Sequence, residues 1–125
     1  VKRWVVEDGQ EILENAKESV IICASIDEFQ SKIKFFSTIL DRLKRNEIKI
    51  RIALSGEEKE INKISNKLKI KIAPISFKTK FFIADSEQIL FIISNNSSEE
   101  DIAIWLNTPF FASTVSYMFN QAVKS

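Results

Sequence analysis

The segment SVIICAS, residues 19–25, limits the fold more than any other part of the chain. Its five central residues are apolar, and three of them are β-branched. A continuous run of this kind, in place of the alternation of a half-exposed strand, indicates a strand that is buried on both faces. Helices provide such cover in α/β folds. The sequence therefore predicts a sheet with helices on its faces.

The remaining periodicities fit this α/β fold. Helices are predicted over residues 8–18, 27–45, 57–69 and 108–125, with Asp27 as cap of the second and Thr108 and Pro109 opening the last. Strands are predicted over 47–56, 69–76, 80–84, 89–94 and 102–107, and Pro74 suggests a strand end or an edge position. Strands separated by helices favour parallel pairing, and the later hairpin adds antiparallel strands. The expected architecture is one domain, residues 1–125, with a mixed sheet flanked by helices.

Composition excludes several classes of function. The 125 residues carry 18 Lys and Arg against 17 Asp and Glu, so bulk attraction to nucleic acid is not implied. The longest apolar run is too short to span a membrane. The single Cys23 has no internal disulfide partner, which favours a reducing, cytoplasmic location. The chain has no histidine, the commonest metal ligand, and we expect neither a metal nor another cofactor.

A candidate site centres on KTKFFIAD, residues 78–85. Lys78 and Lys80 are two residues apart and would share one face of a strand, whereas regular alternation would turn Asp85 the other way. Polar residues at the end of the partner strand could complete a cluster that binds an anion or a hydroxylated ligand; they are Ser94, Asn95 and Asn96. The alternative is that the lysines are solvated at a strand start and Asp85 begins a turn.

The order of elements and this segment resemble one half of the phospholipase D fold. That family carries His-x-Lys, four residues, Asp, and then Gly-Ser-x-Asn. Lys80, Asp85 and Asn95 match, whereas Lys78, Ile92 and Ile93 stand at the His, Gly and Ser positions, so the signature is degenerate. A protonated lysine does not replace the attacking imidazole. The resemblance therefore implies a single half-unit that is not an enzyme.

The stretches DGQEILENAKESVIICAS and AIWLNTPFFASTVSYMF resemble the C-terminal effector domain of TrmB-type archaeal transcription regulators. This resemblance implies a non-catalytic domain that senses an effector, such as a sugar or a phosphorylated metabolite. It also implies a homodimer that reaches DNA only through a winged-helix domain. Because the sequence begins at Val1, we expect that domain to lie upstream.

Two alternatives remain open, a purely structural dimerisation module and a residual phosphodiesterase or nuclease. A further uncertainty is the basic alternation of Lys67, Lys69 and Lys71, which could form a positive stripe with Lys49 and Arg51. No aromatic residue is interleaved there, so a solvated face is favoured over nucleic-acid binding. The sequence does not name the effector, the operator or the dimer geometry.

Overall fold

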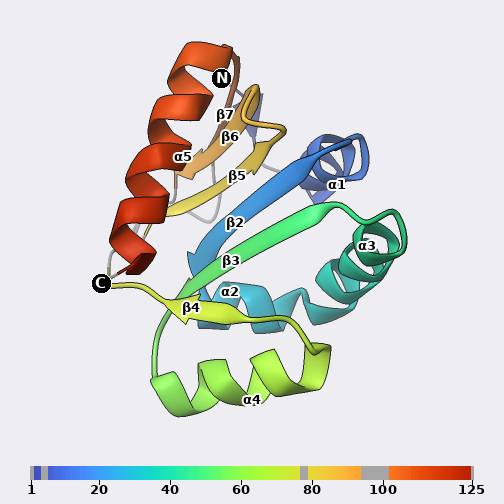
Figure 1. Cartoon of the computed structure of the whole chain (residues 1–125), viewed down its shortest axis with the longest axis vertical. Helices are drawn as coiled ribbons and strands as arrows, with labels where there is room; N and C mark the ends of the chain where they lie inside the picture. The colour runs from blue at the N-terminus through green and yellow to red at the C-terminus, as the bar shows by residue number, and fades with distance from the viewer. Residues whose placement is uncertain (1, 4–5, 77–78, 94–101, 125) are drawn as a thin grey trace.

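The computed structural model describes residues 2–3, 6–76, 79–93 and 102–124 (Figure 1). The helices are α1 (Val6–Glu14), α2 (Ile26–Ser31), α3 (Ile33–Arg45), α4 (Glu58–Leu68) and α5 (Pro109–Lys124). The strands are β1 (Lys2–Arg3), β2 (Ser19–Ser25), β3 (Lys49–Ser55), β4 (Ile72–Pro74), β5 (Lys80–Ala84), β6 (Gln88–Ile93) and β7 (Ile102–Asn107). The order of elements is the predicted one, except that β1 is additional and two helices, α2 and α3, replace the single helix predicted over 27–45.

The described strands form one seven-stranded sheet in the order β1-β7-β6-β5-β2-β3-β4. β2 pairs in parallel with β3, and β3 with β4. On its other side β2 pairs antiparallel with β5, and the following pairs up to β7 are antiparallel too. The predicted mixed sheet is confirmed, and β4 with Pro74 lies at its edge. β2 is the strand at which the pairing changes from parallel to antiparallel.

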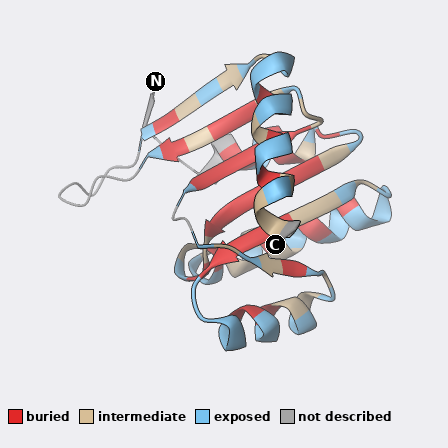
Figure 2. Ribbon diagram, turned by 60° about the vertical axis from the view of Figure 1, so that its left-hand side comes forward, coloured by how far each residue is buried: buried red, intermediate tan, exposed pale blue. Residues whose placement is uncertain are grey.

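Helices cover both faces of this sheet. The larger core lies under α1, α2, α3 and α4, and a smaller one lies under α5. In β2, Val20 and Ile22 belong to the larger core, whereas Ile21 and Cys23 belong to the smaller one. Figure 2 shows the buried residues concentrated in the central strands between the two layers. The prediction that SVIICAS is buried on both faces is thus confirmed.

The predicted helix over 27–45 is wrong in one respect, because the structure divides it at Lys32 into α2 and α3. Lys32 has φ −123° and ψ 33°, and its backbone N–H donates to the carbonyl of Phe29. The apolar spacing continues across this break, and Phe29 stacks on Phe36 at a centroid distance of 4.5 Å. Neither glycine nor proline marks the division, so helical periodicity alone could not reveal it.

The predicted cap Asp27 is also corrected. α2 begins at Ile26, and the residue before it, Ser25, has the extended backbone of a helix cap. The Ser25 hydroxyl accepts a hydrogen bond from the backbone N–H of Glu28 at 3.2 Å. Asp27 instead lies in the first turn, where its negative charge is favourable near the helix N-terminus.

Gly56 positions the exit of β3 against the start of α2. Its φ is +145°, and a Cβ added there would lie 2.5 Å from Cγ2 of Ile26. Only a residue without a side chain allows this approach. The carboxyl ends of β2 and β3 are therefore held close to the first turn of α2.

The last helix begins as predicted, and Thr108 Oγ1 accepts from the Phe111 backbone N–H at 3.5 Å. Its buried ridge consists of Ala112, Ser116 and Phe119. None of the helices in the described ranges is both long and apolar enough to cross a membrane.

Candidate functional site

Lys80 lies at the end of the sheet that is formed by the C-terminal residues of β2 and β3. It opens β5, which runs antiparallel to β2 with Phe81 opposite Cys23. The β2 end leads directly into α2, so α2 lies beside the start of β5. Lys80 is only 8% exposed. A buried ammonium requires compensation by hydrogen bonds or an opposite charge.

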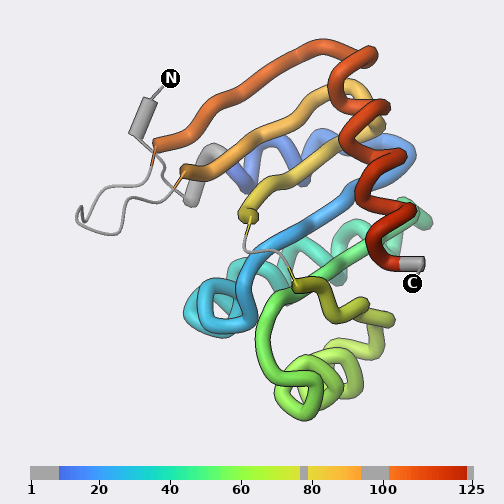
Figure 3. The backbone as a smooth tube through the Cα atoms, turned by 90° about the vertical axis from the view of Figure 1, so that its left-hand side faces the viewer, coloured from blue at the N-terminus to red at the C-terminus, as the bar shows by residue number. Residues whose placement is uncertain are grey.

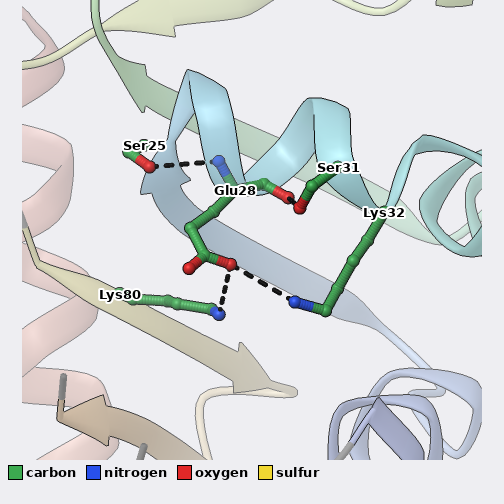
Figure 4. Close-up of polar contacts among 5 residues, drawn as sticks. All are labelled: Ser25, Glu28, Ser31, Lys32 and Lys80. Carbon is green, nitrogen blue, oxygen red and sulfur yellow. Dashed lines mark hydrogen bonds and ion pairs between the residues drawn. The ribbon is translucent and has the colours of Figure 1, made fainter. Parts of the chain in front are cut away.

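That compensation comes from Glu28 on α2. Lys80 Nζ lies 2.9 Å from Glu28 Oε2, and Lys32 Nζ lies 3.3 Å from the same oxygen. Figure 4 shows the two ammonium groups converging on this carboxylate, one from β5 and one from the end of α2. The signature lysine is therefore engaged by a carboxylate of its own chain.

Local structure explains why Glu28 is placed there. Ser25 and Glu28 have the Ser-x-x-Glu spacing of a capping box, in which the glutamate side chain would turn back to the cap residue. Here only the serine half forms, because the Glu28 carboxylate turns to Lys80 and Lys32 instead. Burial of Ile26 and Phe29 against the larger core fixes the orientation of α2.

The electrostatics keep Glu28 ionised. Partial burial raises the pKa of its carboxyl, but the hydrogen bond and charge of Lys80, with a smaller contribution from Lys32, outweigh burial and hold the pKa below its ordinary value of 4.5. An external phosphate at Lys80 would therefore compete with a carboxylate that is charged at neutral pH.

Cys23, next to this end of the sheet, is not an alternative nucleophile. Its Sγ donates a hydrogen bond to the carbonyl oxygen of Thr79 at 3.3 Å. Burial raises the pKa of the thiol to about 12, so it stays protonated near neutral pH. A thiol is reactive, and ligates metals, as the thiolate. Within the described ranges, no three His, Cys, Asp or Glu side chains lie close enough to hold a metal ion.

The structure does not bring Asp85 to this cluster. Asp85 follows the last residue of β5, at the opposite end from Lys80 and roughly 16 Å away at the rise of an extended strand. Its carboxylate accepts hydrogen bonds of 2.7–3.1 Å from the backbone N–H groups of Lys17, Glu18 and Ser19. Asp85 thus ties the β5–β6 turn to the connection between α1 and β2, which is the turn role that the sequence left open.

The other predicted ligand residues, Lys78, Ser94, Asn95 and Asn96, lie outside the described residues. Glu28 and Lys32 were not among the residues that the sequence predicted for this site. Their spacing of four residues and the Ser-x-x-Glu pattern after a buried strand were the available signals. Neither signal indicates a partner 52 residues further along the chain.

Comparison with known proteins identifies the family and fold. The family model for the "Transcriptional regulator TrmB, EBD N-terminal subdomain" matches residues 2–124. TrmBL2, an archaeal chromatin protein whose structure shows a novel mode of DNA binding, has a TM-score of 0.66 and 14% identity over 97% of this chain. This chain spans only 51% of that one. No curated protein matches at a significant level.

Two bacterial proteins have the same fold. Nuc from Salmonella typhimurium, a phospholipase D family member, has a TM-score of 0.63 and 16% identity over 90% of this chain and 82% of its own. NucT from Helicobacter pylori has a TM-score of 0.71 and 12% identity over 96% of this chain and 88% of its own. These identities show a shared fold alone. Because the family model covers nearly the whole chain, the protein belongs to the TrmB family of transcriptional regulators as an EBD N-terminal subdomain, with a phospholipase D-like fold.

Proposed function

We propose that this chain is a non-catalytic effector-sensing and dimerisation domain of a TrmB-type regulator, which reaches DNA through a winged-helix domain elsewhere in the protein. One observation carries the non-catalytic part. Lys80, which stands at the signature lysine position, contacts Glu28 at 2.9 Å instead of being open to a substrate phosphate. An effector would act by binding one orientation of the paired DNA-binding domains more tightly than the other.

Phosphodiester cleavage in this fold family needs an attacking group and a cation for the phosphate. The chain has no histidine to attack, and the Cys23 thiol stays protonated. Glu28 offsets the charge of Lys80 at the place where a phosphate would need it. Both the supply of an attacking group and the binding of a phosphate by Lys80 are therefore unfavourable at this end of the sheet.

We expect the purified chain not to hydrolyse bis(4-nitrophenyl) phosphate above the rate of a Lys80→Ala variant. Release of 4-nitrophenolate, followed by absorbance, measures the rate. Glu28→Gln serves as a second comparison, because it removes the competing charge without adding a nucleophile. Turnover by the wild type that Lys80→Ala abolishes would instead support the residual phosphodiesterase.

The outer face of α5 is the surface we propose for dimerisation. Three large side chains on it are strongly exposed, Phe110 at 82%, Tyr117 at 65% and Met118 at 64%. Their spacing places them on one side of the helix, opposite the buried Ala112 and Phe119. Exposed aromatic and methionine side chains that gather on one face are typical of protein interfaces.

Charge on α5 favours a second copy of this chain as the occupant. Charged residues make up 28% of the chain, yet α5 contains a single one, Lys124, at its end. A two-fold contact brings each patch against its own copy, so charges on the patch would repel each other. The face formed by Phe110, Tyr117 and Met118 has no such charges. It is therefore suited to pairing with itself.

Tyr117→Glu and Met118→Glu are each expected to weaken the dimer at least about tenfold, since each places like charges at a two-fold contact. Sedimentation equilibrium over a range of concentrations gives the dissociation constant. Asn66→Glu, at an exposed position of α4, adds the same charge away from α5 and should leave the dimer unchanged. A monomeric wild type, or dimers that tolerate both α5 variants, would contradict this surface.

A further inference from the structure

We propose that a groove between α5 and the β3–β4 edge of the sheet binds a small organic anion. The groove has a volume of about 240 Å³. Arg51 of β3, Lys71 just before β4, and Phe119 and Val123 of α5 line it. Figure 3 shows α5 running from the β7 side of the sheet toward β3 and β4. Phe119 and Val123, in the C-terminal half of α5, line the groove. This groove is separate from the Lys80–Glu28 cluster, which lies with α2 on the opposite face.

Charge around the groove is strongly uneven. The whole chain is nearly neutral, with 18 Lys and Arg against 17 Asp and Glu. The three segments that line the groove, residues 49–55, 69–76 and 109–124, contain no Asp or Glu. The cations of the two strand segments are Lys49, Arg51, Lys69 and Lys71, of which Arg51 and Lys71 line the groove. The groove is therefore a local region of positive charge that favours an anion.

The strand register brings two of these cations together. Ile52 pairs with Ile72, so Arg51 and Lys71, each one residue earlier, are neighbours on the same face. Like charges on neighbouring strands repel each other. Neither side chain forms an ion pair with a carboxylate of the described residues. An anion between them would replace repulsion by two attractions.

A hydrogen bond to α5 orients the Arg51 guanidinium for anion binding. Its Nη1 donates to Oδ1 of Asn120, a residue of α5 one position beyond the groove residue Phe119. A guanidinium has five N–H donors, so this bond holds the planar group and leaves other donors for a ligand. Lys71, which is exposed, can approach the same anion with its flexible ammonium.

The walls limit what the anion can be. Phe119 and Val123 make one side of the groove apolar. The volume lies below the roughly 300–1,000 Å³ of pockets for larger ligands, so the apolar part of the ligand must be compact. Phe119 is only 3% exposed and cannot serve as a stacking platform for nucleobases. A phosphate ester with a single ring or a short chain fits these limits better than an oligonucleotide.

The anion site itself follows from the groove, and only its role in regulation rests on the proposed function. Phe119 and Asn120 face or adjoin the groove, whereas Tyr117 and Met118 lie on the outer face of the same helix. A ligand bound to Arg51, which is hydrogen-bonded to Asn120 of α5, would therefore act on the helix that carries the dimer surface. Anion binding and dimer geometry would then be coupled through α5.

Phenyl phosphate is the probe that tests the groove, with binding followed by heteronuclear NMR on the wild-type chain. We expect saturable shifts at Arg51, Ala73 and Phe119 and weaker binding of inorganic phosphate, which lacks the ring. Lys71→Gln should weaken phenyl phosphate binding about tenfold, as loss of a charge-assisted contact does. Lys71 is exposed, so this variant should fold. Lys59→Gln, an exposed cation on α4, is the matched control and should bind as the wild type does.

Three results would overturn the proposal. One is an absence of saturable shifts up to about 10 mM phenyl phosphate, the range of very weak ligands. Another is equal weakening by Lys71→Gln and Lys59→Gln, which would mean non-specific charge attraction. The third is tighter binding of single-stranded oligothymidylate, which would assign the surface to nucleic acid. Failure of the groove with an intact α5 dimer leaves the proposed function standing, whereas anion binding by a strict monomer contradicts the dimerisation role.

Discussion

Asp85→Ala is expected to lower the free energy of unfolding by about 3 kcal/mol. Its carboxylate accepts from three backbone N–H groups that link α1 to β2, and hydrogen bonds to charged groups each contribute about 1.5–3 kcal/mol, less where water can replace them. Asp85 also has φ +56°, which costs alanine about 1 kcal/mol more than a residue that tolerates this region. Urea denaturation at neutral pH measures the loss.

Three further variants separate these two contributions. Asp85→Gly removes the hydrogen bonds without the cost of the positive φ, and adds only the larger chain entropy that glycine loses on folding. Asp85→Asn keeps one acceptor oxygen and also tolerates it, so it should be the least damaging. Ser86 has φ +53°, and Ser86→Ala therefore reports the backbone cost at a neighbouring position without loss of a carboxylate. An Asp85→Ala variant no less stable than Ser86→Ala would show that the carboxylate does not stabilise the turn.

Glu28→Gln is expected to destabilise the chain by about 2 kcal/mol at neutral pH. It removes a carboxylate 2.9 Å from an ammonium that is 8% exposed. Breaking a fully buried ion pair costs about 3–5 kcal/mol. Because Glu28 is 36% exposed, we expect a smaller loss of stability, about 2 kcal/mol. Lys80→Met, which replaces the ammonium by an apolar group of similar length, should cost less. The double variant should be more stable than the sum of the two losses predicts, because each residue acts through the other.

The pH dependence of Glu28 has a definite sign. Because the pKa of this carboxyl is lowered in the folded state, its stabilisation is fully present above the unfolded pKa, ordinarily 4.5. It is lost as the pH falls through the lower folded pKa. The stability difference between wild type and Glu28→Gln should therefore be constant from neutral pH to about pH 5 and shrink below it. Thermal denaturation across this range gives the difference.

Glu11→Gln is the matched control for this pH series, since Glu11 is an exposed glutamate of α1. Its stability should follow that of the wild type within about 0.5 kcal/mol at each pH. If the difference in stability between wild type and Glu28→Gln instead increased toward acid pH, the ion pair with Lys80 would not be what stabilises the charged form of Glu28.

Local patterns were enough to predict most elements of the fold. A β-branched run such as that of β2 fits only where both faces are covered, and the stripe of Phe36, Ile39, Leu40 and Leu43 specifies the buried side of α3. The hairpin between β5 and β6 followed from a polar turn between two apolar runs. These features depend on neighbours in sequence, so the sequence displays them directly.

The candidate site depended on contacts that sequence spacing does not encode. The pattern of lysines and aspartate suggested a single cluster, but the extended β5 separates Lys80 from Asp85 by its whole length. The carboxylate that Lys80 meets comes from α2, which follows a strand paired with β5. The position of that helix results from the Ser25 cap, the close approach at Gly56 and the burial of Phe29.

The sequence by itself determined the mixed sheet between helices, the position of Pro74 at a strand end or an edge, and the absence of any imidazole, because these follow from periodicity, backbone chemistry and composition. Only the tertiary structure decided that Glu28 neutralises Lys80, that Asp85 binds backbone N–H groups, and that Arg51 and Lys71 lie side by side beneath α5. Electrostatic interaction depends on distance in space, and it is the pairing of strands and the packing of helices that set those distances.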